Sequence, residues 1–305
     1  MTSSRPPHRA PATRRPRVPR AAASKPRPRK RFGQHFLLPP WARKVVEAIA
    51  PEPGDVFLEI GPGTGALTLP LAATGAPILA VEVDRDLVAA LAGSVPRNVT
   101  VMTGDVLTAD VFPVLTGLEP QRPPDAAAAD RPARRFRIVG NLPYYIASPI
   151  LVRLIDWHRR EGAFADATVM VQREMADRLV ARPGTKDYGV LTVLLGQHAR
   201  ITRRLDLPST AFKPAPKVRS SVIHLAFGPP AVRVVDEALF ERMVKAMFGQ
   251  RRKTLTNALK GFDPTAPAVL ALAGIDGRRR PETLEPAEMA RLADLFHDVR
   301  TPRML

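Results

Sequence analysis

Cysteine is absent from the 305 residues of the chain. Its absence excludes disulfide bonds and thiolate metal sites, and it fits a reducing compartment such as the cytoplasm. Long apolar runs are also missing, since none approaches the roughly 18 residues that a transmembrane helix needs. The N-terminus has no apolar segment of the kind found in secretory signals. We therefore expect a cytoplasmic protein without a membrane anchor, and we predict no metal site.

Acidic residues are scarce relative to basic ones, with 29 Asp and Glu against 46 Lys and Arg, so the net charge is +17. A surplus of this size favours a polyanionic partner such as nucleic acid. Much of the surplus lies at the N-terminus, because residues 1–31 hold eleven Lys or Arg and no Asp or Glu. The rest of the chain is moderately basic, at about +6.

Residues 1–30 combine this charge with dense proline, which breaks helices and offers little to bury, so we predict a disordered basic tail. Attraction to RNA phosphates is one interpretation of the tail. A solubilising appendage is an equally good one. A mitochondrial transit peptide is less favoured, because the prolines prevent the amphipathic helix that such a peptide needs.

Strands and helices alternate along residues 31–228. Short apolar runs predict strands at 55–60, 78–83, 99–103, 137–140, 168–172 and 221–227. Helical patterns lie among them at 41–50, 64–73, 84–91 and 148–160. The alternation predicts an α/β domain built on a parallel sheet with helical crossovers.

Two segments depart from this rhythm. Residues 119–135 are rich in Pro, Ala, Asp and Arg, and we interpret them as a surface loop insertion. After residue 228 strand patterns stop, and helical patterns follow at 236–248, 252–260, 266–273 and 286–296. We therefore predict a second, small all-helical domain at residues 229–305.

A glycine turn closes the first predicted strand, in the sequence Glu59-Ile-Gly-Pro-Gly-Thr-Gly65. Glycine allows positive φ in a tight turn and lets a ligand come close to the backbone. Gly61, Gly63 and Ala66 also fit the G-x-G-x-x-A fingerprint of dinucleotide sites, so the turn alone does not choose between NAD and S-adenosylmethionine (SAM).

Two carboxylates follow the next two strands. Glu82 ends one strand and can accept both hydroxyls of a ribose, which NAD and SAM share. Asp105 follows the other and could accept hydrogen bonds from an adenine amino group, although Asp is also common as a turn or N-cap residue. The glycine turn, Glu82 and Asp105 lie at consecutive strand ends, which form the edge where doubly wound folds bind ligands.

The tetrad Asn141-Leu142-Pro143-Tyr144 ends the fourth strand and favours methyl transfer over hydride transfer. The lone pair of an exocyclic amine is delocalised into its ring and must be freed before it attacks a methyl group. The side-chain carbonyl of Asn141 and a backbone carbonyl near Pro143 can accept the two amine hydrogens, and Tyr144 offers a flat face to a flipped-out base. Catalysis would then rest on positioning and charge stabilisation.

These motifs together resemble the ribosomal RNA adenine dimethyltransferases of the KsgA (RsmA) type, whose wider family includes the Erm resistance methyltransferases. The resemblance runs from about Lys30 to the C-terminus. It covers the N-terminal motif at 29–37, the glycine motif at 59–68, the tetrad, the F-x-P-x-P-x-V-x-S motif at 212–220, and residues 248–259, 274–276 and 280–284.

The resemblance implies a Rossmann-like SAM-dependent methyltransferase sheet with a small helical domain that contacts RNA. It places His35, Leu37, Gly61, Gly63, Glu82, Asp105 and Asn141 at the cofactor SAM. It places the tetrad Asn141, Leu142, Pro143 and Tyr144 at the catalytic centre, with Phe212 opposite Tyr144 across the target base. Two residues depart from the family, which usually has Asn at the positions of His35 and Tyr145.

The resemblance implies an enzyme that dimethylates N6 of two adjacent adenines near the 3′ end of small-subunit (16S) ribosomal RNA. The substrate would be the assembling 30S subunit, so the enzyme would have a role in ribosome biogenesis. The family is typically monomeric, so we expect a monomer. The pair Arg251 and Arg252, with Lys253 and Lys260, favours this branch over Erm-like methylation of large-subunit RNA and offers a surface for RNA phosphates, with Arg278 to Arg280 serving likewise. A non-catalytic assembly or transcription factor on the same fold is the second alternative. An NAD oxidoreductase is a distant third, because no residue near the strand ends resembles a hydride-transfer acid.

Overall fold

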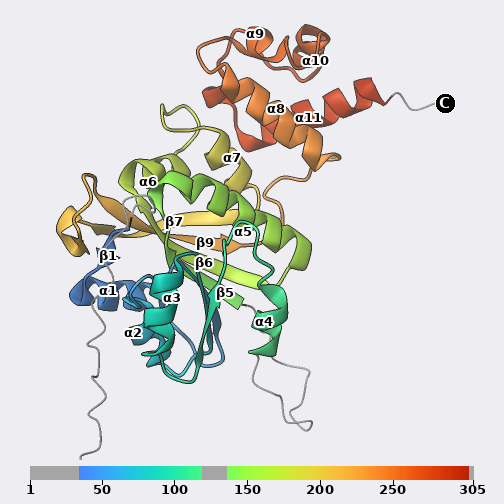
Figure 1. Cartoon of the computed structure of the whole chain (residues 1–305). Helices are drawn as coiled ribbons and strands as arrows, with labels where there is room; N and C mark the ends of the chain where they lie inside the picture. Colours follow the sequence, from blue (N-terminus) through green and yellow to red (C-terminus); the bar gives the residue numbers. More distant parts are fainter. Residues whose placement is uncertain (1–33, 119–135, 302–305) are drawn as a thin grey trace, which may run out of the picture.

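The computed structural model describes residues 34–118 and 136–301 (Figure 1). The predicted tail at 1–30 and the predicted insertion at 119–135 lie outside these ranges. The central sheet contains strands β2 (Val56–Ile60), β3 (Ile78–Glu82), β4 (Val99–Thr103), β5 (Phe136–Asn141), β6 (Phe164–Gln172), β7 (Ala199–Leu207) and β9 (Ser220–Phe227). Their spatial order is β4-β3-β2-β5-β6-β9-β7.

The middle strands are buried on both faces, which is typical of a parallel sheet covered by helices. All five residues of β2 and of β3 are buried. Alternation of side chains sends Leu58 to one core cluster and Phe57 to the other. Helices α1 (Pro39–Ile49) and α2 (Thr68–Ala72) contribute to the Phe57 cluster, while α4 (Phe112–Gly117), α5 (Ala147–Glu161), α6 (Arg173–Leu179) and α7 (Val190–Gly196) contribute to the Leu58 cluster.

The expectation of a parallel sheet is correct for β4 to β6 and wrong for the other edge. β9 pairs antiparallel with β6, and β7 pairs antiparallel with β9. No α-helix joins β7 to β9, only the short turn η3 (Ser209–Ala211) and β8 (Phe212–Lys213), so an antiparallel arrangement needs no crossover. The sequence pattern did not predict β7, because this edge strand carries exposed arginines among its apolar residues.

Most other predicted elements are present with small changes in their bounds. Helix 84–91 corresponds to α3 (Arg85–Ala92), whose N-cap Asp84 accepts a hydrogen bond from the N–H of Asp86. Helix 64–73 is shorter than predicted, because Gly65 has a φ of +84° and keeps the preceding residues in the turn, so that α2 begins at Thr68.

Beyond Phe227 the described residues contain helices and no strand. They are α8 (Glu237–Gly249), α9 (Leu255–Leu259), α10 (Ala266–Leu272), the short η4 (Pro281–Thr283) and α11 (Pro286–Arg300). Figure 1 shows them gathered at one end of the molecule, beyond α7. Their apolar core also takes in Tyr188 and Val193 from the sheet domain, so the two parts share buried surface. The domain boundary at 228 stays a prediction.

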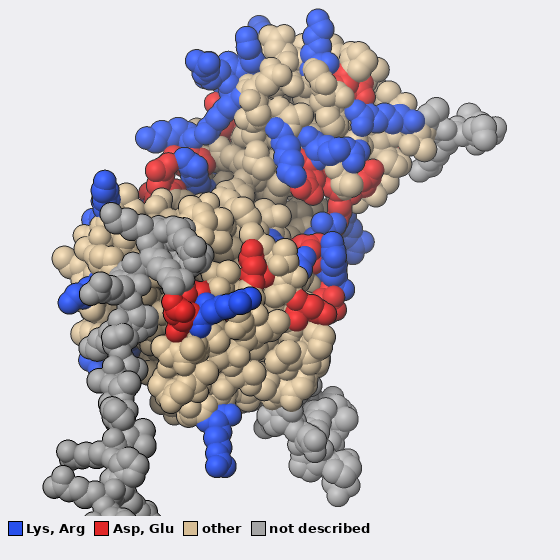
Figure 2. Space-filling model, viewed as in Figure 1, with Lys and Arg blue, Asp and Glu red and all other residues tan. Residues whose placement is uncertain are grey.

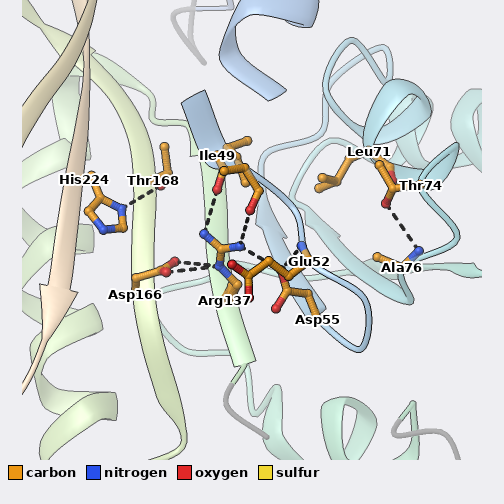
Figure 3. Close-up of polar contacts among 11 residues, drawn as sticks. Ile49, Glu52, Asp55, Leu71, Thr74, Ala76, Arg137, Asp166, Thr168 and His224 are labelled. Carbon is orange, nitrogen blue, oxygen red and sulfur yellow. Dashed lines mark hydrogen bonds and ion pairs between the residues drawn. The ribbon is translucent and has the colours of Figure 1, made fainter. Parts of the chain in front are cut away.

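Arg137 lies near the start of β5, at the end of the sheet opposite the glycine turn, and binds α1 to the sheet (Figure 3). Its guanidinium donates to the backbone carbonyls of Ile49 at 2.7 Å and Ala50 at 3.0 Å, which close the C-terminus of α1. It also pairs with Asp55 at 2.7 Å and with Asp166 at 3.0 Å. Burial alone would lower the pKa of Arg137, but the hydrogen bonds and charges of the two carboxylates outweigh it and raise the pKa. Arg137 thus stays charged while it joins α1, β5 and β6.

No helix within the described ranges is long and apolar enough to cross a membrane. The same part of the chain holds no group of three or more His, Cys, Asp or Glu side chains arranged to bind a metal ion.

Candidate active site

Four adjacent strands bring the predicted site residues to one edge of the sheet. In spatial order, β4 leads to Asp105, β3 ends at Glu82, β2 leads to Gly61, and β5 ends at Asn141. One pocket is lined by residues from all four strand ends. It includes every predicted site residue except Phe212: His35, Leu37, Gly61, Gly63, Glu82, Asp105, Asn141, Leu142, Pro143 and Tyr144.

The glycine turn is held by Glu82. Gly61 and Gly63 have φ values of +66° and +57°, which residues with a side chain rarely adopt. A Cβ on Gly63 would also lie 3.1 Å from the ring of Phe36. The two oxygens of Glu82 accept hydrogen bonds from the N–H of Gly63 at 3.2 Å and of Asp84 at 2.9 Å. Burial raises the pKa of Glu82, and these backbone bonds act against that rise. Each oxygen keeps a lone pair that a ribose hydroxyl could use.

Glu59 is a site residue to which sequence analysis assigned no role. It is 1% exposed, it lines the pocket, and its Oε2 atom has no hydrogen-bond partner among the described residues. The pKa of Glu59 is raised to about 7, chiefly by burial and also by the charge of Glu82, while Thr68 acts in the opposite direction. The signal was present in the glycine motif, where a carboxylate occupies an otherwise apolar strand.

Asp105 combines a structural contact with a place in the pocket. Its Oδ1 atom accepts a hydrogen bond of 3.0 Å from the N–H of Leu107, which is the turn role that the sequence left open. The residue is nevertheless exposed and lines the pocket beside Gly104 and Val106. A turn that fixes one oxygen also aims the carboxylate, so the two roles are compatible.

Segments far apart in the sequence form a small ribbon beside the glycine turn. β1 (Phe36–Leu37) pairs antiparallel with β8, so that Leu37 lies opposite Phe212. This register places Phe212 in the core, where it is 3% exposed and packs with Leu37. Phe212 therefore does not line the pocket in this structure, and its role opposite Tyr144 stays a prediction.

Asn141 is oriented by the segment that precedes β1. Its Nδ2 atom donates a hydrogen bond of 2.8 Å to the backbone carbonyl of His35. The buried Oδ1 atom has no partner among the described residues, although a buried acceptor usually finds one. With the nitrogen held, the oxygen is available to a donor that enters the pocket.

Tyr144 is held by two contacts. Its hydroxyl is 2.6 Å from Oγ of Ser220, the last residue of the F-x-P-x-P-x-V-x-S motif. The ring of His35 stacks against it with centroids 5.8 Å apart and planes at 23°. His35 in turn donates from Nδ1 to the carbonyl oxygen of Pro214 at 2.8 Å. The unusual histidine thus ties the N-terminal motif, the tetrad and the proline motif together.

The cations predicted to contact RNA from the helical part fall into two groups: some bind other residues of the protein, and the others make no ion pair with a described residue. Arg251 donates to the backbone carbonyl of Lys186 and so joins the two parts of the molecule. Arg278 and Arg279 pair with Asp276 and Glu288. The remaining cations of this set are exposed and make no ion pair with a described residue: Arg252, Lys253, Lys260 and Arg280. Figure 2 shows Lys and Arg side chains projecting from the helical part, while the surface over the lower part of the sheet carries few charges.

Comparisons with known proteins agree with this geometry. The family model described as "Ribosomal RNA adenine dimethylase" matches residues 26–298. Ribosomal RNA small subunit methyltransferase A of Aromatoleum aromaticum is 42% identical over 284 residues, covering 92% of this chain and 97% of that protein. The protein of the same name from Anaeromyxobacter sp. strain K is 43% identical over 274 residues, covering 87% of this chain and 92% of that protein.

Solved structures show the same fold. A dimethyladenosine transferase from Plasmodium falciparum superimposes with a TM-score of 0.62 at 21% identity, covering 87% of this chain and 98% of that one. The 23S rRNA methyltransferase ErmE superimposes with a TM-score of 0.58 at 26% identity, covering 86% of this chain and 99% of that one. The sheet is therefore a Rossmann-like methyltransferase sheet.

Proposed function

The chain belongs to the ribosomal RNA adenine dimethylase family, and from that premise we propose that it dimethylates N6 of two adjacent adenines near the 3′ end of small-subunit ribosomal RNA. The supporting observation is the free Oδ1 atom of Asn141, which is buried and fixed beside the cofactor pocket. An exocyclic amine that enters the pocket brings the donor that this oxygen lacks.

The cofactor is SAM, which supplies a methyl group bound to a positively charged sulfur. The residues of the pocket fit this group. Glu82 suits the ribose hydroxyls, Asp105 suits the adenine amino group, and Gly63 leaves room where a Cβ would meet Phe36. The buried carboxylate of Glu59 gives the pocket a third acidic group, as expected for a cationic ligand.

The side chains of the tetrad position the target amine. Oδ1 of Asn141 accepts one amine hydrogen, and a backbone carbonyl of the tetrad accepts the other, so that the nitrogen lone pair is freed from the ring. Bound SAM would supply the methyl group to this nitrogen and leave as S-adenosylhomocysteine, and the surplus proton on the nitrogen would pass to solvent water. Tyr144, fixed by Ser220 and His35, presents its ring to the base.

The partner that we propose is ribosomal RNA in the assembling 30S subunit, met by a monomer in the cytoplasm. The exposed cations Arg252, Lys253, Lys260 and Arg280 suit RNA phosphates, because each is without an ion-pair partner among the described residues. The basic tail at 1–30 adds charge of the same sign.

The test is incubation of the protein with labelled SAM and unmethylated 30S subunits, followed by mass spectrometry of the nucleosides. We expect N6,N6-dimethyladenosine, formed about 10²-fold or more slowly by the Asn141→Ala variant. Purified 50S subunits serve as the comparison, because the likeness to ErmE makes large-subunit RNA the second candidate. Methylation of 50S alone would select that candidate. Absence of SAM binding in calorimetry would instead favour a non-catalytic factor.

A further inference from the structure

Tyr145 lies at the mouth of the active-site pocket with its ring largely in solvent. It is 60% exposed and lines the pocket, whereas its neighbour Tyr144 is partly buried. Both belong to the single turn η2 (Tyr144–Ile146), where successive side chains point about 120° apart because the turn has about three residues. One tyrosine therefore faces inward and the next faces out.

The backbone beneath Tyr145 is well anchored. The N–H of Ile146 donates to the carbonyl of Pro143 at 3.1 Å, and the buried Ala147 begins α5 immediately afterwards. The Tyr145 side chain itself makes no hydrogen bond and no ring contact with a described residue. An anchored turn thus presents an aromatic side chain that is mostly open to solvent.

Three cations lie on the segment 212–220, which is joined to the neighbouring Tyr144 by the hydrogen bond to Ser220. Lys213, Lys217 and Arg219 are exposed and form no ion pair with a described residue. The segment that carries them is joined to the tetrad by the Ser220–Tyr144 hydrogen bond and to His35 through Pro214. An exposed aromatic ring together with unpaired cations on an adjoining segment is a combination that binds single-stranded nucleic acid, through base stacking and phosphate contacts.

We propose that Tyr145 stacks on the base adjacent to the flipped adenine and thereby makes the enzyme sensitive to that neighbour. The inference rests on the proposed function. When one of two adjacent adenines enters the pocket, the other lies next to it on the strand, at the mouth. A purine offers more stacking area than a pyrimidine, so the ring favours a second adenine in that place.

The test is steady-state methylation of unmethylated 30S subunits by the parent enzyme and by Tyr145→Ala, Tyr145→Phe and Val152→Ala. Val152 is a matched control, since it is 45% exposed and lies on α5 outside the pocket. Loss of one stacked base raises KM for the subunit about tenfold in Tyr145→Ala. Tyr145→Phe keeps its ring and stays near the parent value. The Kd for SAM is unchanged in all four proteins, and thermal unfolding checks that they are folded.

A second substrate tests the identity of the neighbour. In subunits where one of the two adenines is replaced by uridine, the parent methylates the remaining adenine more slowly, while Tyr145→Ala responds much less to the replacement. Equal responses of the two enzymes, or an unchanged KM in Tyr145→Ala, overturn the inference while the parent's activity still supports the proposed function. A parent enzyme that binds SAM but methylates no 30S subunit overturns both.

Discussion

The side-chain amide of Asn141 donates to the backbone carbonyl of His35 across 2.8 Å. This bond decides which end of the amide faces the pocket, because Nδ2 is engaged and Oδ1 is left without a partner. The acceptor comes from the backbone, so it does not depend on the histidine side chain. The N-terminal motif therefore orients the catalytic tetrad as well as lining the cofactor pocket.

The first prediction concerns Asn141. Replacement by Ala removes the acceptor for the target amine, so kcat should fall by about 10²-fold or more, the effect typical of losing one preorganised polar group. The Kd for SAM, measured by calorimetry, should change little, because Glu82 and Asp105 remain. Asn141→Asp is the matched variant, because its carboxylate keeps the shape of the side chain but cannot donate to the carbonyl of His35 and is repelled by it. Near-normal turnover in the Ala variant would contradict the mechanism.

The position of the site could be predicted from the sequence because the relevant residues follow strands. Glu82, Asp105 and Asn141 each come directly after an apolar run, and parallel strands carry such residues to one edge. The environment of Phe212 could not be read in the same way. Its burial depends on the pairing of β8 with β1, and a two-residue strand has no periodicity to recognise.

Contacts between distant segments were equally beyond the sequence. The stacking of His35 on Tyr144 joins residues more than a hundred positions apart, and no local pattern encodes it. β7 could not be predicted for a different reason. It is an edge strand that pairs only with β9, and its arginines interrupt the apolar pattern by which a strand is recognised. Glu59 is visible in the glycine motif, but the sequence does not show that its carboxylate is buried in the pocket, and its role follows from that burial.

The second prediction is a pH dependence of stability that arises from Glu59. Its pKa is near the ordinary value of 4.5 when the chain is unfolded and is about 7 in the fold, so the folded state holds the proton more tightly. The cofactor-free protein should therefore lose stability as the pH rises from 4.5 to 7, by up to about 3 kcal/mol.

Glu59→Gln removes this loss, because a neutral amide is not deprotonated. The variant should be more stable than the parent at pH 8, and the difference in melting temperature should shrink towards pH 5. Parallel melting curves for both proteins across this range give the measurement. A difference that does not change with pH would show that Glu59 is already ionised in the fold.

The third prediction concerns Arg137. Replacing it with Met leaves the partly buried carboxylates of Asp55 and Asp166 without their cation, and the carbonyls of Ile49 and Ala50 without a donor. Removing one partner of a fully buried ion pair typically costs about 3–5 kcal/mol of unfolding free energy, and the partial exposure of the two carboxylates places this loss towards the lower end of that range. Urea denaturation measures it. Arg278→Met is the control, because that ion pair lies in solvent, and it should unfold like the parent. Similar midpoints for the two variants would refute the structural role.

The last prediction separates two basic residues of the helical part. Lys253 is exposed and unpaired among the described residues, so Lys253→Ala should weaken RNA binding and reduce the slope of log affinity against log salt by about one. Arg251 is bound to the carbonyl of Lys186, so Arg251→Ala should lower the melting temperature as well as the affinity.

Lys245→Ala supplies the control for both variants. Lys245 is an exposed lysine of the same helical part, but it is paired with Glu241 one turn away on α8. Its loss should leave the salt slope unchanged, because a cation already neutralised by a neighbour releases fewer counterions from RNA. Binding to 30S subunits at several salt concentrations measures all three. Equal slopes for Lys253→Ala and Lys245→Ala would mean that Lys253 does not touch a phosphate.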